Sequence, residues 1–176
     1  MRRGLALLAL LALAAQPAWA QGKTKGPVQP ASVEALEVCE IFARGDVLAV
    51  EAASAAGWDA YEDESESPYV RSYSAAMELP GIGYADLFAL VESYPDQTLG
   101  YCRIDVAGPV GNGHAAIQAI QDLERYEGQS QLVSEGTFAS LIGRGGPQTL
   151  LLTHWTTDSF VIQLTIITPR AGATGQ

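Results

Sequence analysis

The sequence predicts an α+β domain in which a mainly antiparallel sheet carries its helices on one face. Two observations support this fold class. Segments with the two-residue period of a strand follow one another in two blocks, and the 3.6-residue period of a helix is confined to the first part of the chain and one central segment. Because the strands do not alternate with helices, we expect the element order ααβββαβββ.

Three helices are expected, over residues 32–43, 46–57 and 113–126. Their expected N-caps are Ser32, Asp46 and Asn112, because short polar side chains accept hydrogen bonds from the first backbone amides of a helix. Glycines at or just beyond the expected C-terminal ends stop all three. Trp58 follows the glycine that ends the second helix and is expected to anchor the core.

Six strands are expected in two blocks of three, separated by turns rich in Gly and Pro. They cover residues 69–79, 86–94, 99–106, 134–142, 148–156 and 160–168. The last strand alternates so that Phe160, Ile162 and Leu164 share one fully apolar face. The acidic run over residues 59–66 has no such period, and we expect it to be an exposed loop.

The two cysteines lie in elements that point toward one core. Cys39 lies on the apolar stripe of the first helix, and Cys102 lies on the inward face of the strand over residues 99–106. Both belong to the part of the chain that we expect to be exported into an oxidising compartment, so a disulfide is predicted. It would close a loop of about 64 residues and stabilise the fold by roughly 4 kcal/mol.

The chain begins with the features of a secretory signal peptide. Arg2 and Arg3 give a positive start, residues 5–15 are apolar, and Ala18 and Ala20 are the small residues before a cleavage site. The apolar segment is shorter than the roughly 20 residues of a membrane-spanning helix. We expect removal of residues 1–20, no transmembrane segment afterwards, and a periplasmic or secreted protein.

The rest of the chain has the size of one domain. Residues 21–31 are predicted to be a flexible leader, residues 32–169 a single domain and residues 170–176 a tail. The chain has 10 Lys and Arg against 20 Asp and Glu, and loss of Arg2 and Arg3 leaves 8 against 20, a net charge of −12. Such a surface repels phosphate backbones, so a nucleic acid is not an expected partner.

Residues that could carry chemistry are few, because the chain has only two histidines, His114 and His154. His154 shares a strand face with Leu150 and Leu152, and Asp158 in the following turn could approach it. The candidates for the catalytic residues of a small hydrolase are therefore His154, Asp158 and His114. However, the serine motifs GxSxG and SxxK are missing. No cofactor is predicted, because the turn GPVGNG lacks the GK[ST] of a phosphate-binding loop.

No metal site is predicted either. The acidic run over residues 59–66 lacks the DxDxDG spacing of a calcium loop, and HExxH is also missing. A different kind of site is favoured by Tyr101 and Arg103, which lie together on the outward face of a strand. Tyr and Arg are enriched where proteins bind other proteins, so this pair is a candidate binding surface.

A pattern of cysteine, glycine and aromatic positions spans most of the predicted domain. It consists of the cysteine in the first helix, the Gly57-Trp58 that ends the second, the segments RSYSAAMEL and GYCRIDV, and the closing LLLTHW and FVIQLTI. In this pattern the chain resembles a loose group of small exported proteins of Gram-negative bacteria whose function is not established. The resemblance implies export and a disulfide, and it carries over no catalytic or ligand residues.

These observations favour a non-catalytic binding module that recognises a periplasmic protein or an envelope component through an exposed sheet face. The alternative is a small hydrolase that uses His154 with Asp158. A third possibility is a structural accessory of the envelope without a discrete ligand.

Overall fold

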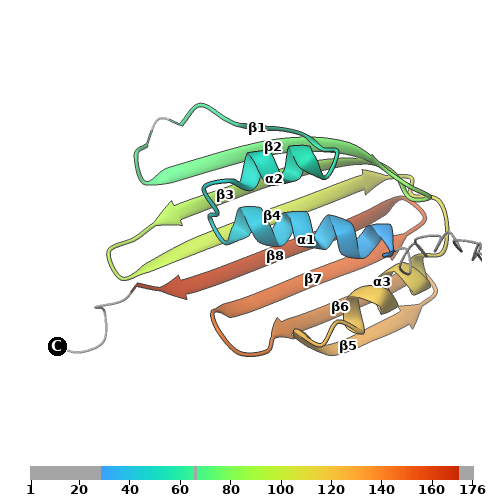
Figure 1. The fold of residues 1–176 in the computed structure, drawn as a ribbon. Helices are drawn as coiled ribbons and strands as arrows, with labels where there is room; N and C mark the ends of the chain where they lie inside the picture. Colours follow the sequence, from blue (N-terminus) through green and yellow to red (C-terminus); the bar gives the residue numbers. More distant parts are fainter. Residues whose placement is uncertain (1–28, 66, 171–176) are drawn as a thin grey trace, which may run out of the picture.

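A computed structural model describes residues 29–65 and 67–170 of the chain. Eight strands form one antiparallel sheet in the order β1-β2-β3-β4-β8-β7-β6-β5, and three helices lie together on one side of it (Figure 1). The α+β class, the antiparallel sheet and the placement of the helices on one face are confirmed. The predicted signal peptide, most of the leader and most of the tail lie outside the described residues.

Each half of the sheet is a meander of four strands. The first half contains β1 (Asp59–Glu62), β2 (Val70–Leu79), β3 (Gly83–Ser93) and β4 (Gln97–Ala107). The second half contains β5 (Tyr126–Val133), β6 (Gly136–Gly143), β7 (Gln148–Thr156) and β8 (Ser159–Pro169). The halves join where β4 pairs with β8 in the middle of the sheet.

The helices bury one face of this sheet. They are α1 (Ala31–Ala43), α2 (Ala49–Ala55) and α3 (Gly113–Gln121). In α1, the fully buried side chains of Leu36, Cys39 and Phe42 repeat at helical spacing, so one stripe of the helix packs on β3 and β4. The helix α3 covers β5, β6 and β7 with Ile117 and Ile120.

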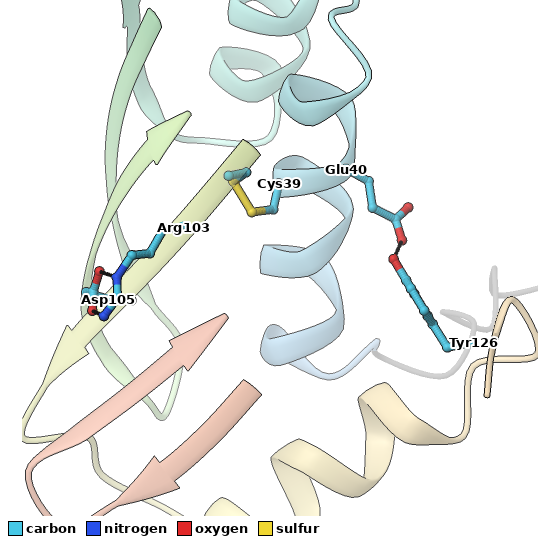
Figure 2. The surroundings of a disulfide bond; sticks show 6 residues. Cys39, Glu40, Arg103, Asp105 and Tyr126 are labelled. Carbon is cyan, nitrogen blue, oxygen red and sulfur yellow. Dashed lines mark hydrogen bonds and ion pairs between the residues drawn. A yellow bond between two sulfur atoms is a disulfide. The ribbon is translucent and has the colours of Figure 1, made fainter. Parts of the chain in front are cut away.

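The predicted disulfide is present and ties α1 to β4 (Figure 2). The Cα atoms of Cys39 and Cys102 are 5.5 Å apart and 63 positions apart in sequence, and both side chains are fully buried. Two strand positions before Cys102, a Cβ added to Gly100 would lie 1.6 Å from the backbone oxygen of Ala43. Only glycine therefore lets the end of α1 approach β4 this closely.

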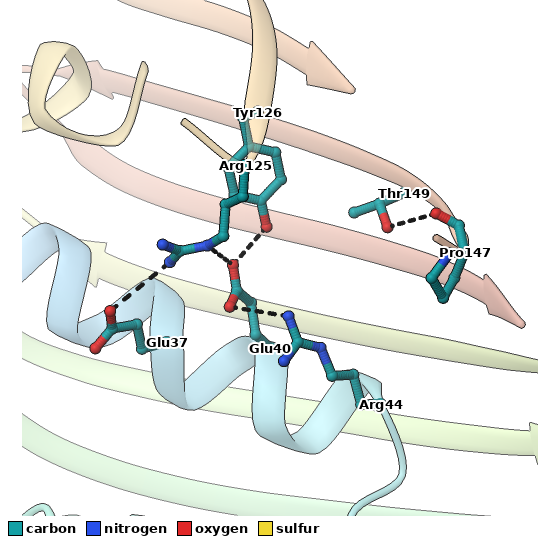
Figure 3. A network of polar contacts seen from close by, with 7 residues as sticks. All are labelled: Glu37, Glu40, Arg44, Arg125, Tyr126, Pro147 and Thr149. Carbon is teal, nitrogen blue, oxygen red and sulfur yellow. Dashed lines mark hydrogen bonds and ion pairs between the residues drawn. The ribbon is translucent and has the colours of Figure 1, made fainter. Parts of the chain in front are cut away.

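A buried carboxylate joins α1 to the start of β5. Glu40 is 5% exposed and accepts hydrogen bonds from Tyr126 Oη at 2.7 Å, Arg125 Nε at 2.7 Å and Arg44 Nη2 at 3.3 Å (Figure 3). Burial and the bond to Glu40 hold the pKa of Tyr126 well above its usual range, so the hydroxyl stays a donor. These three donors compensate for burying the charge.

The predicted element order is wrong in two places, because β1 and β5 were not expected and the order is ααββββαββββ. The first part of the acidic run forms β1, an edge strand paired to β2 from Asp59 opposite Ala76 to Glu62 opposite Tyr73. The strand β5 occupies the opposite edge, and Tyr126 is its only buried residue. Neither edge strand shows the apolar alternation that identifies a half-buried strand, because their side chains are largely exposed.

The third helix is also shorter than predicted, since it ends at Gln121 and the chain then turns into β5. Of the three predicted caps, Asn112 is confirmed: its Oδ1 accepts from the amide of Ala115 at 3.1 Å. Ser32 is wrong as a cap, because it lies inside α1 and its hydroxyl donates to the carbonyl of Ala116 on α3. Asp46 is also wrong, since it accepts from the amide of Leu48 in the turn before α2.

Candidate functional site

The candidate site is the face of the sheet opposite the helices, hereafter the open face. It is formed by alternate residues of each strand, and no helix of the described residues covers it (Figure 1). The register aligns these residues in rows across the sheet. One row contains Asp86, Asp105, Val161, His154 and Phe138. The next contains Phe88, Arg103, Gln163, Leu152 and Ser140.

The centre of the open face contains an ion pair between Arg103 and Asp105. Arg103 Nε and Nη2 each lie 2.6 Å from an oxygen of Asp105, and its Nη1 lies 3.2 Å from Oε1 of Gln163. Figure 2 shows this pair on the opposite side of β4 from Cys39. The structure places Arg103 and Tyr101 outward on β4, as the alternation predicted, and Asp105 binds the arginine through two hydrogen bonds.

Beside this centre lies an apolar patch, formed by Phe138 and Ile142 on β6 and Leu150 and Leu152 on β7. Their exposed fractions are 40%, 51%, 42% and 38%. Leu150 lies opposite Ile142 in the register. A shallow cavity of about 440 Å³ adjoins the patch, and Gln129 and Gln131 of β5 form part of its rim. Exposed apolar side chains that lie together on one face make this patch a candidate contact surface for another molecule.

His154 lies at the border of this patch. Its ring stacks on Phe138 with a centroid distance of 5.6 Å, and its Nε2 lies 3.2 Å from the hydroxyl oxygen of Ser159. Burial lowers the pKa of His154, the charge of Arg103 lowers it further, and Asp105 opposes both effects. His154 is therefore neutral at pH 7 and can serve as a base or as a polar contact.

In the described part of the chain, neither of the other two candidates for catalysis forms a hydrogen bond with His154. His114 lies at the start of α3 and lines a different cavity, together with Trp155, whose side chain belongs to the covered face. In the turn after β7, the amide of Asp158 donates to Oγ1 of Thr156. Within residues 29–65 and 67–170, the ring of His154 forms a hydrogen bond with Ser159 alone.

The turn GPVGNG leads into α3, and Val110 donates its amide to the carbonyl of Ile82, so this segment connects β4 to the helix. In the described part of the chain, no three His, Cys, Asp or Glu side chains lie close enough together to hold a metal ion. None of the described helices is both long enough and apolar enough to cross a bilayer.

Sequence reasoning overlooked the apolar patch. The signal was present in the run Thr149-Leu150-Leu151-Leu152, where a strand of an antiparallel sheet carries apolar residues on both faces. Such a strand is typical of a sheet covered on both sides. Comparison of the chain with protein-family models, with curated proteins and with solved structures found no match.

Proposed function

We propose that the protein is a non-catalytic binding module of the periplasm that takes up a protein partner on its open face. The observation that carries this proposal is the apolar patch. Its four side chains lie between 38% and 51% exposed on two adjacent strands, although the other face of the same strands is already covered by α3. The patch adds little to the fold, so its apolar character needs a second explanation.

The neighbouring residues favour a protein as the partner. Arg103 is paired with Asp105, and Gln163, Gln129 and His154 surround the patch with donors and acceptors. An apolar centre with a polar rim is the usual composition of a protein interface. The disulfide fits a compartment outside the reducing cytosol, where such bonds persist.

The test replaces apolar patch residues without disturbing the strand. Leu150→Thr with Leu152→Thr introduces β-branched side chains, which suit a strand, at two positions of β7 and removes much of the patch. The matched control is Val47→Thr with Leu48→Thr. It also removes two exposed apolar side chains, which lie in the segment before α2 and are 75% and 60% exposed. Binding is measured by titrating a periplasmic extract over the immobilised exported protein and identifying what is retained.

The proposal predicts saturable retention of one protein by the wild type and by the control, and at least tenfold weaker retention by the β7 variant. Equal retention by all three proteins, or no saturable retention by the wild type, would contradict it.

The second candidate function is a hydrolase, and the contact between His154 Nε2 and the Ser159 hydroxyl favours it. A neutral imidazole 3.2 Å from a hydroxyl is the arrangement that activates a serine. However, Oγ1 of Thr156 accepts from the amides of Asp158 and Ser159 and also contacts the Ser159 hydroxyl, which is how a turn is stabilised. A panel of ester and amide substrates decides between the two: turnover that His154→Ala and Ser159→Ala both abolish would favour the hydrolase.

A further inference from the structure

The other half of the open face contains a trough that follows β2. Its floor is made of small residues, since Ala76 and Ser74 are the outward side chains of the middle strand. Asp59 and Asp86 flank Ala76 from the neighbouring strands, and in the next row Ser74 lies between two aromatic residues. We call this cavity of about 420 Å³ the β2 trough; its principal side chains are Asp59, Tyr61, Ser74, Tyr84, Asp86 and Phe88.

The walls of the β2 trough combine aromatic rings with carboxylates. Tyr61, Tyr84 and Phe88 are 55%, 57% and 45% exposed, so their rings are free to contact a ligand. Strands β1 and β3 lie on either side of β2, which separates the backbones of the two walls by about 10 Å. That width accommodates one extended side chain over Ala76 and Ser74. Ring faces attract cations, and carboxylates on both walls attract them further.

The carboxylates of the β2 trough have no cation of their own. Asp59 and Asp86 form no ion pair with any basic residue in the described part of the chain. Among the described residues, Arg103 is the one arginine of a strand whose side chain belongs to the open face. Its Nε and Nη2 both donate to the carboxylate of Asp105. Asp86 lies directly opposite Asp105 in the register, but Asp105 is already paired with Arg103. Asp86 is therefore the carboxylate of the two that a cation supplied from outside would pair with.

We propose that the β2 trough binds the lysine or arginine side chain of the protein partner. The proposal rests on the proposed function, because the cationic side chain would belong to the same protein partner that covers the apolar patch. Charge complementarity supports it: the chain after Ala20 carries a net charge of −12, and the trough concentrates carboxylates on the face that is free of helices. The Arg103–Asp105 pair on the same face shows the contact that a partner guanidinium would make with Asp86.

The test uses small probes, so it does not depend on finding the partner. The blocked amino acids N-acetyl-arginine methylamide and N-acetyl-lysine methylamide are titrated into the isotope-labelled exported protein, and the citrulline and norleucine analogues serve as neutral controls. Backbone resonances of β1, β2 and β3 report binding. Asp59→Asn with Asp86→Asn removes two charges from the trough, whereas Glu34→Gln with Glu51→Gln removes two exposed charges from α1 and α2.

We expect the two cationic probes to shift resonances of β1 to β3 at about tenfold lower concentration than the neutral probes, and the advantage to be lost in the Asp59/Asp86 variant alone. Equal binding of cationic and neutral probes would overturn the proposal. So would equal weakening in the Glu34/Glu51 variant, because net charge alone would then explain the attraction.

The same variants separate this proposal from the proposed function. Partner binding that survives the Asp59/Asp86 change but fails in the Leu150/Leu152 variant would overturn the trough and leave the binding module standing. Cation binding in a protein that retains no partner would overturn the proposed function and, with it, the assignment of the β2 trough to a partner side chain, although the trough would still bind cations.

Discussion

The two faces of the sheet contain similar side chains but differ in what covers them. Leu151 points to the covered face and is fully buried, whereas its neighbours Leu150 and Leu152 point to the open face and are 42% and 38% exposed. The covered face is closed by three helices and a disulfide, so its apolar residues already explain the fold. The comparison shows that the helices bury the apolar residues of one face and leave those of the other partly exposed to water.

The largest destabilisation of the covered face is expected from removal of the disulfide that links α1 to β4. Cys39→Ala with Cys102→Ala should lower the free energy of unfolding by about 4 kcal/mol, because the unfolded chain regains the entropy of a loop of 63 positions. Urea unfolding of the oxidised wild type and the variant measures the difference. A loss below about 1 kcal/mol would show that the link between α1 and β4 does not stabilise the fold.

The three consecutive leucines of β7 compare the two faces within one strand. Leu151→Ala should cost about 3 kcal/mol because it leaves a cavity between the sheet and the helices. Leu150→Ala and Leu152→Ala should each cost less than about 1.5 kcal/mol, since much of each side chain is already in water. Chemical denaturation of the three variants checks this order. Equal losses would mean that the open face is covered after all.

Much of the covered face could be predicted from the sequence, because an element that is buried on one side has apolar residues at regular helix or strand spacing. The disulfide partners, the α1 stripe around Cys39 and the apolar row of β8 all follow from it. The edge strands could not be predicted, since β1 is a short strand of largely exposed residues, two of them acidic, and β5 buries only Tyr126. Their place in the sheet depends on backbone pairing with β2 and β6.

For the candidate site, the sequence predicted that Tyr101 and Arg103 point outward, and the structure places both on the open face. The β2 trough could not be foreseen, because Asp59 and Asp86 become neighbours only through the register of β1, β2 and β3. Contact between His154 and Ser159 likewise depends on the turn that joins β7 to β8.

Glu40 tests how the second half of the sheet is held to α1. Glu40→Gln should destabilise the protein by about 2 kcal/mol, because the neutral amide weakens the charged hydrogen bonds to Arg125 and Arg44. The matched control is Glu37→Gln. The side chain of Glu37 is about half exposed to water and lies 3.8 Å from Arg125 Nη2, so this change should cost less than about 0.5 kcal/mol. Thermal unfolding ranks the two variants, and the reverse order would contradict this role of Glu40.

The smallest effect is expected for His154 on the open face. Folding lowers the pKa of His154 below its usual value of 6.5, so the unfolded chain binds its proton more readily than the folded protein does. The wild type should therefore lose stability relative to His154→Gln as the pH falls below 6.5 toward the folded-state pKa. The difference in unfolding free energy between the two proteins, measured from pH 8 to pH 5, should be constant above about pH 7.5 and change only below it. A difference that is flat throughout would contradict the shift.

The most direct measurement of the open face is hydroxyl-radical footprinting of its phenylalanines, with and without the partner. Phe88 and Phe138 are 45% and 40% exposed, whereas Phe42 and Phe160 on the covered face are fully buried. We predict rapid oxidation of Phe88 and Phe138 in the free protein, slow oxidation of Phe42 and Phe160, and protection of the first pair when the partner binds. Slow oxidation of Phe88 and Phe138 in the free protein, or no change on binding, would contradict the account.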